Sequence, residues 1–152
     1  MAISLFKPIL FKAKILELIP GLIHKDKIIE QEVLVELKSG EKRIFADENV
    51  LIKDDKIGKW IEISVYLVLG RVTKNNKKEC AVGPAYLLKG KVTKLKAQGD
   101  ETKKVLRGVL DCGAAKFTFS SEYDPELRVG DFIVYNSDIG YPAGIENVQS
   151  ER

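Results

Sequence analysis

The chain has 152 residues and a formal net charge of +3, and 45% of its residues are hydrophobic while 31% are charged. This length allows one ordinary domain or two small ones, and the hydrophobic content suffices for a globular core with a well-solvated surface. No stretch approaches the roughly 18 consecutive apolar residues of a membrane span, and Lys7 and Pro8 interrupt the apolar start, so neither a membrane helix nor a signal peptide is predicted.

The cysteine content argues against a disulfide framework and against a zinc site. Cys80 and Cys112 lie far apart in the sequence, form no CxxC motif and have no cluster of histidines nearby. We interpret them as two semi-buried free thiols in a reducing cytoplasm. A cytoplasmic protein without a bound metal or another cofactor is therefore expected.

Charge is unevenly distributed along the second half of the chain. Residues 86–107 carry seven cations against two acids, whereas residues 108–152 carry three cations against eight acids. A nucleic-acid binder usually shows a stronger basic excess. The basic segment Lys89–Lys104 therefore has two interpretations, a charged exposed face or protected strand edge, and a groove for nucleic acid.

Strand patterns dominate the first half, and no long window keeps a helical period. A first strand is predicted at Ile9–Leu18, and Ile19-Pro20-Gly21 is expected to end it before a basic connection. Asp47 is a plausible N-cap for a helical turn or two. The other elements predicted for this half are strands at Gln31–Lys38, Glu41–Ala46 and Lys59–Leu69 and a short closing strand at Glu79–Val82.

The second half repeats this plan after Gly83-Pro84, which is the best domain boundary in the sequence. We therefore predict two domains, residues 1–83 and residues 85–152. The elements predicted for the second domain are strands at Tyr86–Leu95, Lys103–Asp111, Ala115–Ser121 and Asp131–Asn136, a capped helical turn at Asp124–Leu127, and a last short strand at Ile145–Val148.

The two halves can be superimposed as a repeat. Gly58 matches Gly130 with an offset of 72, and Phe45 matches Phe117 with the same offset. Both glycines precede a strand that has an aromatic residue near its start. At the first strand, residues 11–15 match residues 88–92 with an offset of 77, and the difference of five falls in the first loop, where insertions are expected.

Each half offers about five short strands, which is too few for a two-sheet sandwich with a sizeable core. Closing five strands into a barrel removes the free edges, and alternate side chains then fill the inside. Ala13 or Gly90 suits the bend of the first strand, and the apolar phase slips after it, as a bulge would cause. The predicted fold is all-β, with two tandem small five-stranded β-barrels of the oligonucleotide/oligosaccharide-binding (OB) type.

The second half also resembles a degenerate cold-shock domain, which is a family of OB folds, over about Leu88–Val148. The matching residues are Lys89-Gly90-Lys91-Val92, Gly108-Val109-Leu110-Asp111, Lys116-Phe117-Thr118-Phe119-Ser120-Ser121, Leu127-Arg128-Val129-Gly130-Asp131-Phe132 and Gly140–Val148. The resemblance implies binding of single-stranded nucleic acid by base stacking on aromatics of the second and third strands. This chain departs from the pattern, because its second strand, Leu106–Leu110, contains no aromatic residue.

Phe117 and Phe119 alternate on the third strand and so share one face. If that face is inside the barrel, they are core residues. If it is outside, they form a stacking platform beside cations, the arrangement that single strands need. The candidate nucleic-acid ligands are Lys89, Lys91, Lys94, Arg107, Phe117 and Phe119.

The remaining polar residues give no indication of catalysis. His24 is alone in a loop without a nucleophile motif, and the acids Asp54-Asp55 and Asp47-Glu48 lack metal-ligand spacing. Trp60 is expected to be half-buried core. We therefore predict a non-enzymatic cytoplasmic protein that binds single-stranded nucleic acid, RNA rather than DNA, through the C-terminal barrel; the alternative is a protein-interaction or scaffold module.

Overall fold

The computed structural model describes residues 7–67, 70–83, 87–100, 102–136 and 143–150. The regular secondary structure of these residues is β-strand apart from one turn of 3-10 helix, so the predicted all-β class is confirmed. The strands are β1 (Phe11–His24), β2 (Lys27–Leu37), β3 (Lys42–Asp47), β4 (Trp60–Tyr66), β5 (Arg71–Lys74), β6 (Ala81–Val82), β7 (Leu87–Gly99), β8 (Lys104–Asp111), β9 (Lys116–Glu122), β10 (Phe132–Asn136) and β11 (Gly144–Ser150), and the 3-10 turn η1 (Asp54–Lys56) lies between β3 and β4.

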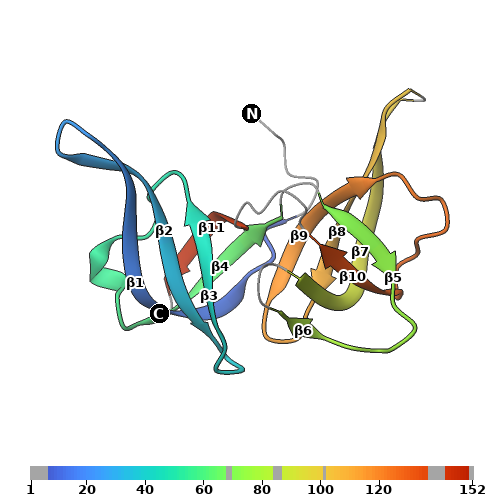
Figure 1. The fold of residues 1–152 in the computed structure, drawn as a ribbon, viewed down its shortest axis with the longest axis horizontal. Helices are drawn as coiled ribbons and strands as arrows, with labels where there is room; N and C mark the ends of the chain where they lie inside the picture. Colours follow the sequence, from blue (N-terminus) through green and yellow to red (C-terminus); the bar gives the residue numbers. More distant parts are fainter. Residues whose placement is uncertain (1–6, 68–69, 84–86, 101, 137–142, 151–152) are drawn as a thin grey trace.

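Five strands form a closed barrel at one end of the molecule (Figure 1). They pair in the order β1-β2-β3-β11-β4, and β1 also pairs with β4, which closes the ring. The closing pair is antiparallel, with Phe11 opposite Ile63 and Lys14 opposite Trp60. Alternate residues of β1 and β2 are buried inside, as the period-2 pattern predicted.

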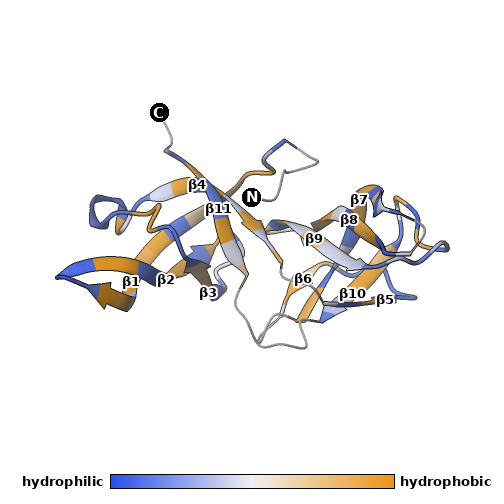
Figure 2. Cartoon of the chain, turned by 90° about the horizontal axis from the view of Figure 1, so that it is seen from above, coloured by the Kyte–Doolittle hydropathy of each residue, from blue (hydrophilic) through white to orange (hydrophobic). Residues whose placement is uncertain are grey.

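The second barrel contains five strands in the order β9-β8-β7-β10-β5, and β5 returns close to β9. The short strand β6 pairs with β7. The two barrels are joined by a parallel pairing of β4 with β9, in which Val65 lies opposite Phe117. The prediction of two small five-stranded barrels is confirmed, and Figure 2 shows hydrophobic residues concentrated on their strands.

The fifth strand of each half lies in the barrel of the other half. β5 comes from the first half and pairs with β10, with Val72 opposite Tyr135. β11 comes from the second half and pairs with β4, with Val148 opposite Ile63. The division into domains 1–83 and 85–152 stays a prediction, and the strand pairing crosses that boundary in both directions.

The sequence repeat corresponds to one backbone arrangement that occurs twice. The N–H of Gly58 donates to the carbonyl of Ile15, and the N–H of Gly130 donates to the carbonyl of Val92, at 2.6 and 2.8 Å. These pairs keep the offsets of 72 and 77. Both glycines have positive φ, +85° and +99°, which a residue with a side chain rarely adopts.

The predicted bulges also occur at matching positions of the first strand of each barrel. The register of β1 shifts between Ile15 and Glu17, and that of β7 shifts between Val92 and Lys94. Each shift moves the following side chains to the other face, which explains the slip in the apolar phase. The tandem repeat is therefore confirmed at the level of hydrogen bonds.

The core runs through both barrels without a break. Phe11 and Phe45 of the first barrel meet Phe117 of the second, with ring centroids 5.8 and 6.1 Å from Phe117. Phe45 and Phe117 are the two residues matched by the repeat, so equivalent positions touch across the junction. Such tilted and edge-on contacts are favourable for aromatic rings.

The predicted end of the first strand at Ile19-Pro20-Gly21 is wrong, because β1 continues to His24 and pairs with β2 along this length. β4 pairs with β1 only over Phe11–Lys14. Beyond that point β1 is an edge strand, where the missing N–H of a proline is tolerated. β7 likewise extends to Gly99, through residues predicted as a loop.

Asp47 does not cap a helix, contrary to the sequence prediction. Its carboxylate accepts hydrogen bonds from the N–H groups of Leu51 and Ile52 and from the Gln31 carboxamide, all at 2.8–2.9 Å. It is fully buried, and this network satisfies its hydrogen-bonding capacity.

The described residues contain no helix long and apolar enough to cross a membrane.

Candidate functional site

The structure decides between the two interpretations of Phe117 and Phe119: both are core residues. Phe117 is 1% exposed and Phe119 is 3% exposed. Phe117 lies opposite the buried Leu110, and Phe119 packs on Tyr135 with ring centroids 5.9 Å apart. A nucleic-acid base cannot reach either ring, so the stacking alternative is wrong.

The four cations predicted as nucleic-acid ligands lie on the opposite, outer face of the same sheet: Lys89, Lys91, Lys94 and Arg107. Lys89 and Lys91 alternate along β7 with the inward residues Leu88, Gly90 and Val92. The Lys89 amine forms a salt bridge with Glu79 at 3.0 Å, and this contact lowers the pKa of the Glu79 carboxyl. Cations and aromatics are thus on different faces, and the expected combined surface is not formed.

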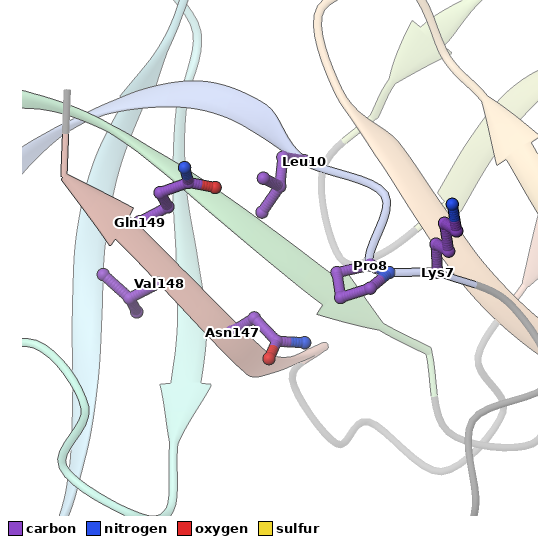
Figure 3. A pocket seen from close by; sticks show the side chains of 6 residues that line it. All are labelled: Lys7, Pro8, Leu10, Asn147, Val148 and Gln149. Carbon is purple, nitrogen blue, oxygen red and sulfur yellow. The ribbon is translucent and has the colours of Figure 1, made fainter. Parts of the chain in front are cut away.

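An open pocket of about 480 Å³ lies where the segment before β1 runs beside β11 (Figure 3). We call it the β1–β11 pocket, and β4, which pairs with both strands, runs between them. Its lining residues are Lys7, Pro8, Leu10, Asn147, Val148 and Gln149. It therefore brings together residues from nearly opposite ends of the sequence, and the strand exchange makes this possible.

The position of Asn147 follows from an irregularity in β11. The register between β11 and β4 shifts between Ile145 and Asn147, so that Asn147 lies opposite Ser64. Its carboxamide nitrogen donates a hydrogen bond to the Ser64 hydroxyl oxygen at 2.9 Å. Because Ser64 is only 2% exposed, this bond holds the Asn147 side chain against a buried partner while the residue itself is exposed.

The polar side chains that line the β1–β11 pocket are a cation and two carboxamides. Lys7 supplies a cation, Asn147 and Gln149 supply carboxamides, and no lining residue is a carboxylate. A lysine ammonium has three N–H donors, and a carboxamide has two donors and an acceptor oxygen. Pro8, Leu10 and Val148 form an apolar part of the wall. This donor set suits a small anion better than a cation.

Other groups considered in the sequence contribute no chemistry to this pocket. Within the described ranges, no group of three or more His, Cys, Asp or Glu residues is placed to hold a metal ion. His24 lies at the end of β1, next to the exposed turn Lys25-Asp26. Trp60 is half-buried at the start of β4, as expected.

Comparison with known proteins identifies a fold. No protein-family model and no curated protein matches the chain. A solved structure that does match is that of the cytoplasmic molybdate-binding protein ModG, in a PEG-grown form with molybdate bound. The match covers 99% of this chain and 100% of the ModG chain, with a TM-score of 0.51 and 15% sequence identity. The chain therefore has the same barrel-type fold, along its whole length.

The predicted function, binding of single-stranded nucleic acid by the C-terminal barrel, is wrong. The predicted platform is core, and the protein that shares the fold is described as binding molybdate, a small ligand. The resemblance to cold-shock domains and the RNA partner receive no support from the comparisons. What remains of that prediction is the barrel fold.

Sequence reasoning missed the pocket residues Lys7, Asn147 and Gln149. Lys7 appeared only as an interruption of an apolar stretch, and Asn147 and Gln149 alternate on β11 as ordinary solvent-facing residues would. The repeat was the one sequence feature that could have pointed to these residues, because equivalent strands of two barrels can carry equivalent sites. The pairing of β11 with the first barrel was needed to bring these residues together.

Proposed function

We propose that this protein binds a small tetrahedral oxyanion of the molybdate type in the β1–β11 pocket. The observation that carries the proposal is the donor set of the pocket, one ammonium and two carboxamides without a carboxylate. The shared fold with ModG supports the choice of molybdate as the first ligand to test. We further propose that the role is binding rather than catalysis, and that the protein acts in the cytoplasm, as ModG is described to do.

The pocket residues would divide the work of holding such an anion. Lys7 would supply the opposite charge and up to three hydrogen-bond donors. Asn147, whose position is set by its bond to Ser64, and Gln149 would each donate from a carboxamide to an anion oxygen. The apolar wall lowers the local dielectric constant, which strengthens these charge-assisted bonds relative to bulk water.

The test is isothermal titration calorimetry of the full chain with sodium molybdate, sodium sulfate and sodium phosphate. We expect molybdate to bind, and Asn147→Asp to weaken binding by at least about tenfold, since it places a negative charge where the anion would lie. Gln98→Glu makes the same chemical change on the exposed end of β7 and serves as the matched control, with an affinity within about twofold of the wild type.

Lys7→Gln removes the only cation of the pocket lining and is expected to reduce the affinity by a similar factor. Lys38→Gln, in the exposed turn after β2, is its control. An absence of heat with all three oxyanions at millimolar concentration would refute the proposal. So would Asn147→Asp and Lys7→Gln variants that bind molybdate as tightly as their controls, because the anion would then be held elsewhere.

A further inference from the structure

The two cysteines, distant in the sequence, meet at one edge of the second barrel. β10 pairs with β7 from Leu87 to Lys91 and occupies one edge of that stretch. β6 and β8 must therefore both lie on the other edge, β6 beside Leu88 and Lys89, and β8 from Lys91 onward. The two strands follow each other along this edge, end to end.

The gap between β6 and β8 falls at Gly90. Ala81 of β6 lies opposite Lys89, and Asp111 of β8 lies opposite Lys91. One more residue in each register places Cys80 and Cys112 at the same position, opposite Gly90. The two thiols therefore belong to the two strand ends that approach each other across this gap.

Individual contacts agree with this placement. The Cys80 thiol donates a hydrogen bond to the carbonyl of Asp111, with sulfur and oxygen 3.6 Å apart. A Cβ added to Gly113 would lie 3.6 Å from the Cβ of Cys80, so Cys80 touches the residues on both sides of Cys112. A Cβ added to Gly90 would lie 3.2 Å from the Cα of Cys112. Disulfides require Cβ atoms about 3.5–4.5 Å apart, and Cys80 already lies beside both chain neighbours of Cys112.

The two thiols differ in access. Cys80 is exposed, whereas Cys112 is 2% exposed. Burial raises the pKa of the Cys112 thiol, and the neighbouring Cys80 and Asp111 add to the increase. Because the thiolate is the nucleophile, the exposed Cys80 is the thiol that meets a reagent from solution first.

We propose that Cys80 and Cys112 are an oxidisable pair that forms an intramolecular disulfide by exchange with a small disulfide such as glutathione disulfide. The Cys80 thiolate attacks one sulfur of the reagent, the reagent's sulfur–sulfur bond breaks, and one glutathione leaves and takes up a proton. Cys112 then loses its proton and attacks the Cys80 sulfur, and the second glutathione leaves as a thiol. Two protein thiols are oxidised and one glutathione disulfide is reduced to two thiols.

The bond would have a structural consequence. It would join the end of β8 to the start of β6, and so bridge the gap in the strand edge beside β7. It would also close the chain from residue 80 to residue 112, a segment that crosses the boundary between the two halves at Gly83-Pro84. Because a cross-link restricts the unfolded chain, we expect the thermal midpoint of unfolding to rise by about 5–15 °C on oxidation.

The experiment treats the full-length protein with glutathione disulfide and follows its intact mass over time. In the wild type we expect a transient gain of one glutathione, followed by its loss and a net loss of two hydrogens. The conversion should be faster at about pH 9 than at neutral pH, because the buried Cys112 must ionise to attack. Tryptic digestion should then yield a linked pair of peptides, Glu79–Lys89 with Gly108–Lys116.

Two variants separate the roles of the thiols. Cys112→Ala should keep a stable glutathione adduct on Cys80, and Cys80→Ser should remain unmodified while folded. The proposal is wrong if the wild type keeps its glutathione adduct at pH 9, or if Cys80→Ser reacts as fast as the wild type. The peptide map of the wild type alone decides the matter where a variant fails to fold, since the absence of the linked pair overturns the proposal.

Discussion

The two barrels follow one plan, but they differ in how they are completed. In the first barrel, β11 lies between β3 and β4 and pairs with β4 from Gly144 to Ser150, so hydrogen bonds close the ring. In the second barrel the equivalent strand is β5, which pairs with β10 only over Arg71–Lys74. The first barrel therefore depends more on its borrowed strand than the second does.

A second difference lies in the first strand of each barrel. Ala13 of β1 is fully buried, and it lies opposite Leu37 of β2 on one side and Ile61 of β4 on the other. At the equivalent position of β7, a Cβ on Gly90 would lie 2.3 Å from the carbonyl oxygen of Asp111. The second barrel is thus tighter where the first strand bends. The two barrels share one sequence plan, but they tolerate side chains of different size at this position, because the neighbouring strand approaches more closely in the second barrel.

The largest effect on the difference between the barrels is expected from removal of residues 143–152. The removed segment contains the buried residues Ala143 and Ile145 and the whole of β11, which is the hydrogen-bonding partner of β4. The first barrel therefore loses its closure and most of its stability. Urea unfolding followed by circular dichroism should show a transition of smaller amplitude and lower midpoint for the shortened chain, because the five strands of the second barrel remain. Addition of a synthetic peptide of residues 143–150 in trans should restore part of the signal.

A chain shortened only to Ser150 is the control and should unfold like the full chain, because β11 ends there. An unchanged urea midpoint for the chain without residues 143–152 would contradict the inferred dependence of the first barrel on β11. It would mean that the pairing of β1 with β4 alone maintains that barrel.

The next largest effects are expected at the aromatic junction. Phe45→Ala and Phe117→Ala each remove a ring that is 1% exposed, and each should lower the free energy of unfolding by about 3–5 kcal/mol. The two values should be similar, because the residues are repeat equivalents that contact each other with centroids 6.1 Å apart. Chemical denaturation of both single variants and the double variant measures this.

The double variant tests whether the barrels share one core. Residues in contact give non-additive changes, and we expect the double variant to lose less than the sum of the single variants. Two unfolding transitions, each shifted by one substitution only, would instead show that each barrel has a core of its own.

The fold could be predicted from the sequence where local chemistry decides it. The glycine turns at Gly58 and Gly130 and the bulges after Ile15 and Val92 depend on neighbouring residues, and they reveal both the repeat and the barrel. Which barrel β5 and β11 join could not be predicted. The alternating pattern of a strand fits either barrel, and only the tertiary structure shows its pairing partners.

The site escaped prediction for a related physical reason. Phe117 and Phe119 were correctly expected to share a face, but alternation does not say which face is inside. Asn147 and Gln149 read as solvent-facing residues of a last strand. Only the insertion of that strand beside Lys7 makes them part of a pocket, so the candidate site depends entirely on the exchange.

Substitutions at Ala13 and Gly90, where the first strand of each barrel bends, compare how tightly the two barrels are packed. Gly90→Ala must displace the Asp111 backbone and should cost about 3 kcal/mol. Ala13→Gly loses one buried methyl group and gains unfolded-state freedom, at a cost of about 1–2 kcal/mol. Urea midpoints of the two variants test this order. A cost for Gly90→Ala equal to or below that of Ala13→Gly would show that the second barrel is not the tighter one.

The smallest effects should be equal in the two barrels, and they test the repeat itself. Gly58→Ala and Gly130→Ala place a side chain at positive φ, with no atom within 4 Å of the new Cβ in either case. Only backbone strain then remains, and each should lower the free energy of unfolding by about 1–2 kcal/mol. Thermal unfolding of the two variants at the same protein concentration compares them. Because both turns end in the same hydrogen bond to the first strand, a difference above about 1 kcal/mol would mean that the barrels transmit local strain differently, and that the repeat is one of chain path and not of energetics.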